Sequence, residues 1–197
     1  MHNFPSPAAT ARRLSRAEST SRETLVRRAV RADVAQIWEL VSEYAAQGLM
    51  LPRTPAQIDA RIDSYVVASD EKGHVVACAA LEEYSPSLAE VSSVAVAPTH
   101  HGKGLGSQVV LGVERLARAR DIEEIFALSL TDNFFLSLGY KPTTVSRFPE
   151  KLARYEALAQ EGVEIVPKRC FNKSLGKAGR VWAAPRLVGA SQKKKRA

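Results

Sequence analysis

The alternation of apolar and polar residues divides the chain into short strands and one-sided helices. Runs rich in β-branched residues and bounded by turn residues predict five strands, at 24–29, 64–68, 75–82, 91–96 and 125–130. Apolar residues spaced three or four apart predict four helices between and after these strands. Their apolar positions are, helix by helix, Ile37, Leu40, Val41 and Tyr44; Ile58 and Ile62; Leu105, Val109, Val113 and Leu116; Phe134, Phe135 and Leu138.

Capping signals indicate where several of these helices begin and end. Asp33 precedes the first helix and is a residue type favoured at N-caps. Before the second helix, Thr54 as N-cap, Pro55 at the first helical position and Gln57 at the third form a capping box. Gly139 follows the last helix, where a left-handed residue commonly ends the helical turn. These signals support the helix assignments independently of the apolar spacing.

With a sixth strand expected after the last helix, the predicted order of elements is β-α-α-β-β-β-α-β-α-β. The residues 69–73 (SDEKG) form a hairpin-like connection between two of the strands, and Pro98 closes the strand at 91–96. This order predicts an α/β (α+β) fold with a mixed, largely antiparallel central sheet and helices on both faces. We expect one domain at 24–180, preceded by a disordered or targeting segment at 1–23 and followed by a basic tail at 181–197.

The charge is distributed unevenly along the chain. Residues 1–24, 25–165 and 166–197 carry net charges of +2, −5 and +10. The body is therefore acidic, and the C-terminal segment, which ends in KKKR at 193–196, supplies the basicity. Because a nucleic-acid-binding domain normally has a basic folded face, this distribution argues against nucleic acid as the partner.

The composition also bears on the compartment. No run approaches the ~18 apolar residues that a membrane span needs, so we expect a soluble protein without a membrane partner. Cys78 and Cys170 lie far apart and outside any metal-ligand spacing, which argues against a disulfide framework or a metal site. We expect a cytoplasmic protein, or one of an organelle matrix if residues 1–23 are a transit peptide. The sequence leaves the oligomeric state open, a homodimer included.

A glycine-rich turn joins a strand to a helix within residues 91–110, VSSVAVAPTHHGKGLGSQVV. At a helix N-terminus the backbone N–H groups lack partners and favour an anion. Glycines at 102, 104 and 106 let this backbone approach a ligand, and His101 and Lys103 add donors or positive charge. The spacing fits neither G-x-x-x-x-G-K-[ST] nor G-x-G-x-x-G. The turn predicts a diphosphate-binding site; the alternative is a turn that serves tight packing alone.

The same turn resembles the acyl-CoA-binding motif [RQ]-x-x-G-x-[GA] of the GNAT superfamily of N-acetyltransferases, with His101 in place of Arg or Gln. FFLSLGY at 134–140 resembles the superfamily's second motif, which packs beneath the pantetheine arm. The resemblance covers roughly residues 24–175 and implies a GNAT-like fold with acetyl-CoA as co-substrate and no metal. The CoA-binding residues that it implies are Val94, Ala95, Val96, His101, Gly102, Lys103, Gly104, Leu105, Gly106 and Ser107.

Within this superfamily the chain looks most like N-acetylglutamate synthases. Four stretches carry the likeness, in the same order: GLMLPRT (48–54), ACAALEEY (77–84), EVSSVAVAP (90–98) and FALSLTDNFFLSLGY (126–140). The resemblance implies a short, stand-alone enzyme that acetylates the α-amino group of L-glutamate, the first step of arginine biosynthesis. Two alternatives stay open: a GNAT enzyme for another small amine or a protein N-terminus, and a non-catalytic CoA-fold module with a basic interaction tail.

The resemblance also implies catalytic and acceptor-binding residues. Period two places Glu90 on the same strand face as Val94 and Val96, and in the family an acid at this position is the candidate base. Ser129 matches a family residue proposed to assist the departing thiolate. Either side chain also fits a structural role, Glu90 as a surface carboxylate and Ser129 as a helix cap. For the acceptor's carboxylates the candidates are Arg53, Lys173 and Ser174.

Overall fold

In the computed structural model, residues 24–176 are described and form a seven-stranded sheet. The predicted flanking segments, 1–23 and 181–197, lie outside the described residues. The sheet order is β1-β2-β3-β4-β5-β7-β6, and in these residues only β4 and β5 pair in parallel. The strands are β1 (Leu25–Arg28), β2 (Tyr65–Ser69), β3 (Val75–Ser85), β4 (Leu88–Val96), β5 (Glu124–Ser129), β6 (Lys141–Thr143) and β7 (Arg169–Ser174). The predicted mixed, largely antiparallel sheet is confirmed.

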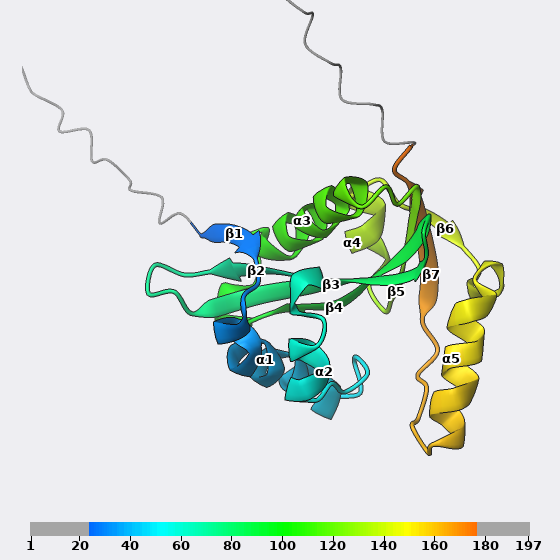
Figure 1. Cartoon of the computed structure of the whole chain (residues 1–197), viewed down its shortest axis with the longest axis horizontal. Coiled ribbons are helices and arrows are strands. Elements are labelled where there is room, and N and C mark those ends of the chain that lie inside the picture. Colours follow the sequence, from blue (N-terminus) through cyan, green and yellow to red (C-terminus); the bar gives the residue numbers. More distant parts are fainter. Residues whose placement is uncertain (1–23, 177–197) are drawn as a thin grey trace, which may run out of the picture.

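Helices cover both faces of this sheet (Figure 1). They are α1 (Val34–Ala46), α2 (Pro55–Asp59), α3 (Leu105–Ala119), α4 (Asp132–Ser137) and α5 (Pro149–Gln160). The pair α1 and α2 lies on one face, α3 and α4 lie on the other, and α5 stands beside β7. Two large apolar cores follow from this layering, one between the sheet and α3 and one between the sheet and α1 with α2, and a third, smaller cluster contains Phe126, Phe148 and Cys170.

Most of the local predictions are confirmed. Thr54 and Gln57 form the capping box, with the Gln57 amide 3.2 Å from Thr54 Oγ1 and the Thr54 amide 3.0 Å from Gln57 Oε1. The predicted apolar face of α3 is buried along its whole length. Gly139 takes a φ of +82° just after α4, which is the left-handed conformation expected there.

Three features differ from the sequence-based predictions or were not predicted. Asp33 precedes α1, but its carboxylate accepts from the Val30 amide and from Arg27 instead of capping the helix. The short edge strand β6 and the helix α5 were not predicted. No helix within residues 24–176 has the length and apolar character needed to cross a membrane.

Candidate active site

A cavity of about 600 Å³ lies where the two parallel strands separate. β4 pairs with β5 only over Leu88–Val91, opposite Glu124–Ala127, and beyond that point β4 pairs with β3 alone. The free edge of β4 and the end of β5 therefore line the cavity, together with the glycine turn and the loop after α1. Ligands of open sheets commonly bind at the carboxyl ends of parallel strands, so this is a binding position that the topology favours.

The glycine turn presents backbone N–H groups to this cavity. Gly102 and Gly104 have φ values of +76° and +74°, a conformation that favours glycine, and Gly104 is the N-cap of α3. Within the described residues, no acceptor is found for the six consecutive N–H groups of residues 102–107. At Gly106 an added Cβ would come 3.3 Å from the Phe134 ring, so that glycine also permits close packing. The turn has the geometry of an anion-binding site.

The two cationic candidates of the turn have different positions. His101 lines the cavity, and its Nε2 lies 2.8 Å from the Val96 carbonyl oxygen and 2.9 Å from the Tyr44 hydroxyl. Because a carbonyl only accepts, this contact requires a hydrogen on Nε2. Tyr44 donates to the same carbonyl at 2.5 Å. His101 therefore secures the end of β4, whereas the Lys103 side chain is exposed and does not line the cavity.

A β-bulge in β4 changes which side chains share a face. Ser92 pairs with Ala80 and Ala95 with Cys78, so two residues, Ser93 and Val94, lie opposite one residue of β3. Ser93 has a φ of +51°. The phase of alternation therefore reverses at this point.

The prediction that Glu90 shares a face with Val94 and Val96 was wrong for this reason. Val94 and Val96 pack toward α3, whereas Glu90 points to the opposite face, toward α5. Ala95 packs in the core beside α1 and does not line the cavity. Since Ala97 N donates to Val76 O in β3, alternation turns the Val96 N–H away from β3 and toward the cavity.

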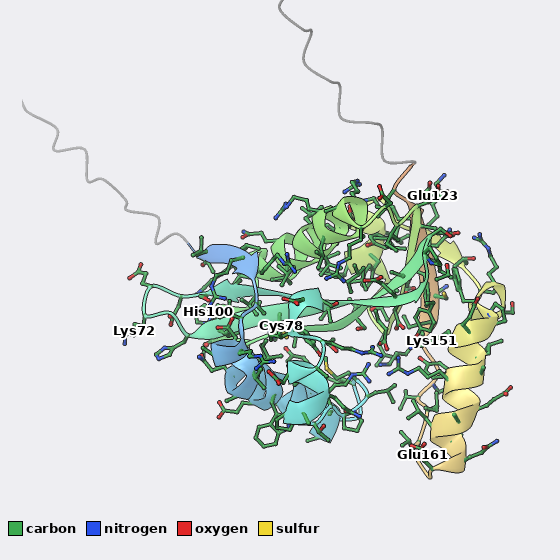
Figure 2. All side chains as sticks on the ribbon, in the orientation of Figure 1. Lys72, Cys78, His100, Glu123, Lys151 and Glu161 are labelled. Carbon is green, nitrogen blue, oxygen red and sulfur yellow. The ribbon has the colours of Figure 1, made fainter. Side chains whose placement is uncertain are left out.

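Glu90 is a buried member of an ion pair and not a surface carboxylate. Its oxygens lie 2.8 and 3.0 Å from Lys151 Nζ, and the Tyr84 hydroxyl donates to Oε2 at 2.8 Å. Burial, together with the charge of Glu90, raises the pKa of Tyr84, so this phenol stays neutral and can donate. Figure 2 shows Lys151 between α5 and the sheet. Both Glu90 and Lys151 line the cavity, which places a charged pair next to any bound ligand.

Ser129 lines the cavity at the end of β5 and is also engaged in its own turn. Its Oγ accepts from the Thr131 amide at 2.9 Å and contacts the Thr131 carbonyl at 3.2 Å. Thr131, not Ser129, is the N-cap of α4. The hydroxyl is therefore held at the cavity wall by a local backbone bond.

Two cationic side chains, Arg53 and Lys168, line the cavity and form what we call its cationic wall. Arg53 lines the cavity, and its Nη2 donates to Glu82 Oε2 at 3.0 Å. Lys168 lines it as well, and its Nζ donates to the Leu49 carbonyl at 2.6 Å, which ties together two loops far apart in the sequence. Burial and repulsion from Lys151 lower the pKa of Lys168. These cations can bind an anionic ligand.

The structure does not bring Lys173 and Ser174 to the cavity. Lys173 Nζ contacts both carboxylate oxygens of Glu114 at 2.8 and 2.9 Å and the Leu138 carbonyl at 2.8 Å, so its donors are used within the fold. Ser174 is exposed at the end of β7. Neither residue lines the cavity, because alternation along β7 points Lys173 toward α3.

Several cavity residues were missed by sequence reasoning, among them Tyr44, Lys151, Tyr155 and Lys168. Tyr44 was assigned only to the apolar face of its helix. Lys151 and Tyr155 belong to α5, which the sequence does signal through Pro149 at its first position and a glutamate in its first turn. Nothing local to Lys168 indicates its role. In the part of the chain that the structure describes, no group of His, Cys, Asp and Glu is arranged to hold a metal ion.

The chain is similar to known acetyltransferases in sequence and structure. An uncharacterized N-acetyltransferase of Chlorobaculum tepidum is 36% identical over 132 residues, which are 67% of this chain and 84% of that protein. An amino-acid acetyltransferase of Pseudomonas fluorescens is 32% identical over 64% of this chain, but the matching part is only 29% of that longer protein.

Two solved structures share the fold. The Rv2747 protein of Mycobacterium tuberculosis, solved in complex with CoA, has a TM-score of 0.66 and 27% identity, covering 76% of this chain and 98% of that one. N-acetylglutamate synthase of Neisseria gonorrhoeae, complexed with coenzyme A and N-acetyl-glutamate, has a TM-score of 0.68 and 23% identity, covering 79% and 36%. The acetyltransferase (GNAT) family profile matches residues 33–140, and this chain belongs to that family.

Proposed function

We propose that this chain transfers the acetyl group of acetyl-CoA to the α-amino group of L-glutamate, the reaction that opens arginine biosynthesis. The observation that carries the proposal is the lining of one cavity, which combines the free backbone amides of the glycine turn with the cations Arg53 and Lys168. The names of the Pseudomonas and Neisseria relatives support an amino-acid acceptor. The chain matches under a third of the Pseudomonas protein, so that protein's name does not by itself assign an acceptor to this chain. The identity of the acceptor is therefore proposed here.

Acetyl-CoA is the donor, and the residues present fit it. The N–H groups of residues 102–107 suit its diphosphate, because the N-terminus of a helix preceded by glycines binds phosphate groups. The N–H of Val96 faces the cavity and suits the amide-rich pantetheine arm. Gly106 and Phe134 leave no room for a side chain beside that arm. The thioester supplies the activated acetyl group.

The acceptor's carboxylates match the cationic wall. Arg53 is 16% exposed at its side chain and uses one nitrogen on Glu82, which leaves other N–H groups for a carboxylate. Lys168 has two ammonium protons beyond the one that it gives to Leu49. An acceptor with two carboxylates would contact both cations, and its amine would then lie toward the split between β4 and β5.

The chemistry requires a neutral amine, a stabilised oxyanion and a proton for the thiolate. When the amine nitrogen attacks the acetyl carbon, the C–S bond breaks, the nitrogen loses a proton and the sulfur gains one. Glu90 is the cavity carboxylate nearest the strand split and is assigned as the proton acceptor, directly or through water. The hydrogen bonds that Lys151 and Tyr84 donate to Glu90 hold this carboxylate in place. Ser129 is assigned to assist the departing thiolate of CoA.

A panel of amino-acid acceptors, assayed by thiol release from acetyl-CoA, tests this function. We expect glutamate to have the highest kcat/KM, above aspartate, glutamine and polyamines. Turnover with polyamines or aspartate but not glutamate would replace the acceptor and keep the family chemistry. No thiol release with any amine, despite CoA binding by calorimetry, would favour the non-catalytic alternative.

Arg53→Ala tests the acceptor wall. Losing one charged partner of a carboxylate costs about 2–4 kcal/mol, so we expect the glutamate KM to rise roughly 30- to 1,000-fold while CoA affinity is unchanged. The fold should tolerate this change because Arg61 and Arg154 also contact Glu82. Arg31→Ala, an exposed arginine outside the cavity, is the matched control. An unchanged KM would remove Arg53 from the acceptor site.

A further inference from the structure

A second, smaller cavity of about 190 Å³ lies behind Arg53. Arg53 and Ser92 line both cavities, so these two side chains form the partition between them. On its other side the small cavity is bordered by Gln57, Ala60 and Arg61, which are exposed. It therefore has an approach from solvent that does not pass through the acetyl-CoA cavity.

The lining of this second cavity has an excess of positive charge. Three guanidiniums, those of Arg53, Arg61 and Arg154, converge on Glu82, whose side chain is 5% exposed. Among the described residues that line the cavity, Glu82 is the only acid. The nearest buried carboxylate beyond it is Glu90, the register partner of Glu82 across β3 and β4, and Lys151 already neutralises that one.

The guanidiniums also have donors without acceptors. Each guanidinium carries five N–H groups. Within the described residues, Arg53, Arg61 and Arg154 each contact one acceptor group, and in all three cases it is Glu82. Arg53 and Arg154 are only 16% and 25% exposed, so water reaches them incompletely. Donors that are partly buried and unused favour a ligand that accepts hydrogen bonds.

The like charges repel one another in the free protein. Burial, followed by repulsion from Arg53 and Arg61, lowers the pKa of Arg154 to about 10. An anion between the guanidiniums would relieve this repulsion and accept two parallel N–H bonds from an arginine. The cavity is large enough for a carboxylate or phosphate group and too small for CoA.

We propose that this second cavity binds a small oxyanion, a carboxylate or a phosphate, between Arg61 and Arg154. The site does not depend on the proposed acceptor. Its effect on turnover does rest on the proposed function: because Arg53 borders both cavities, an oxyanion behind it competes for the guanidinium that would bind the acceptor's carboxylate. Occupancy should then raise the acceptor KM without changing kcat.

Thermal unfolding of the full chain tests the site. The protein is first saturated with CoA, so that the glycine turn is filled and cannot bind the probe. Sodium acetate and sodium phosphate are then titrated against sodium chloride at constant ionic strength. We expect one of the two oxyanions to raise the Tm saturably in the millimolar range and by more than sodium chloride does. The oxyanion that binds more tightly tells whether the natural ligand carries a carboxylate or a phosphate.

Variants separate this site from the acceptor wall. Arg61→Gln and Arg154→Gln each remove a guanidinium that does not line the large cavity, and we expect at least tenfold weaker oxyanion binding in both. Arg31→Gln is the matched control and should bind like the wild type. Equal Tm shifts in wild type and Arg61→Gln, or no shift beyond chloride, would overturn the site.

The kinetic measurement is independent of the binding measurement. With the oxyanion at saturation we expect the acceptor KM to rise several-fold in the wild type and to stay constant in Arg61→Gln. A constant KM in both, with saturable binding, would overturn the coupling through Arg53. Should no amine be acetylated at all, the Tm titration still decides whether the site exists, so the two proposals fail separately.

Discussion

Replacing Lys151 with methionine should strongly destabilise the fold. Lys151 and Glu90 are 4% and 6% exposed at their side chains, and the ammonium contacts both carboxylate oxygens. Removing one member of a buried pair leaves the other charge without compensation and typically costs 3–5 kcal/mol. Tyr84 would still donate to Glu90, so we expect the lower part of this range, about 3 kcal/mol. This is a large share of the roughly 5–15 kcal/mol that holds an ordinary domain folded.

Urea unfolding of the wild type, Lys151→Met, Glu90→Gln and the double variant measures this cost as a double-mutant cycle. Lys151→Met alone should lower the free energy of unfolding by about 3 kcal/mol, whereas Lys151→Met combined with Glu90→Gln should recover at least half of that loss, because no buried charge is then unpaired. Lys141→Met, at an exposed position, is the control and should change it by less than about 0.5 kcal/mol. A loss below 1 kcal/mol for Lys151→Met, or strictly additive losses in the double variant, would refute the reasoning.

Three further outcomes follow from single groups. Gly104→Ala has room for its Cβ but a φ of +74°, so we expect a conformational cost of about 1–2 kcal/mol and CoA affinity roughly 5- to 30-fold lower by calorimetry; unchanged affinity would contradict this. Burial raises the pKa of Cys78 to about 12 and that of Cys170 to about 11, so a thiol reagent at pH 8 should label neither until urea is added. Hydrogen bonds from Arg27 lower the pKa of Asp33, so its stabilisation is present above the unfolded pKa and is lost as pH falls through the folded one; Asp33→Asn should flatten acid unfolding below about pH 4.

The geometry of the glycine turn could be predicted from the sequence because the turn is built from backbone. The N–H groups of this turn point to the cavity because two residues before the helix have positive φ values. Glycines at 102 and 104 predict those values, because glycine adopts positive φ readily. The same holds for much of the fold, since apolar spacing and the capping box of Thr54 act over a few residues. Such short-range signals can be read from the sequence because they do not depend on tertiary contacts.

The face of Glu90 could not be predicted, because the alternation of a strand is reliable only between irregularities. The bulge at Ser93 and Val94 inserts one residue, and no glycine or proline marks it. Period two then predicts the wrong side for every residue across the bulge. As a result, Glu90 lies on the face opposite Val94 and Val96 and points toward α5, where it contacts Lys151.

The charged residues around Glu82 and Glu90 were hard to predict for a different reason: they come from segments that only the fold brings together. Glu82 and Glu90 are register partners on one face of the sheet, and α5 docks there through Lys151 and Arg154, one helical turn apart. Lys151 is the only buried residue of that described helix, so ion pairs hold this wall together with the stacking of Phe148, at the start of α5, on Phe126. An ion-paired wall with surplus cations is costly to bury unless an anion completes it. That cost is the physical reason to expect a carboxylate-bearing acceptor, because a neutral or cationic amine would leave the surplus uncompensated.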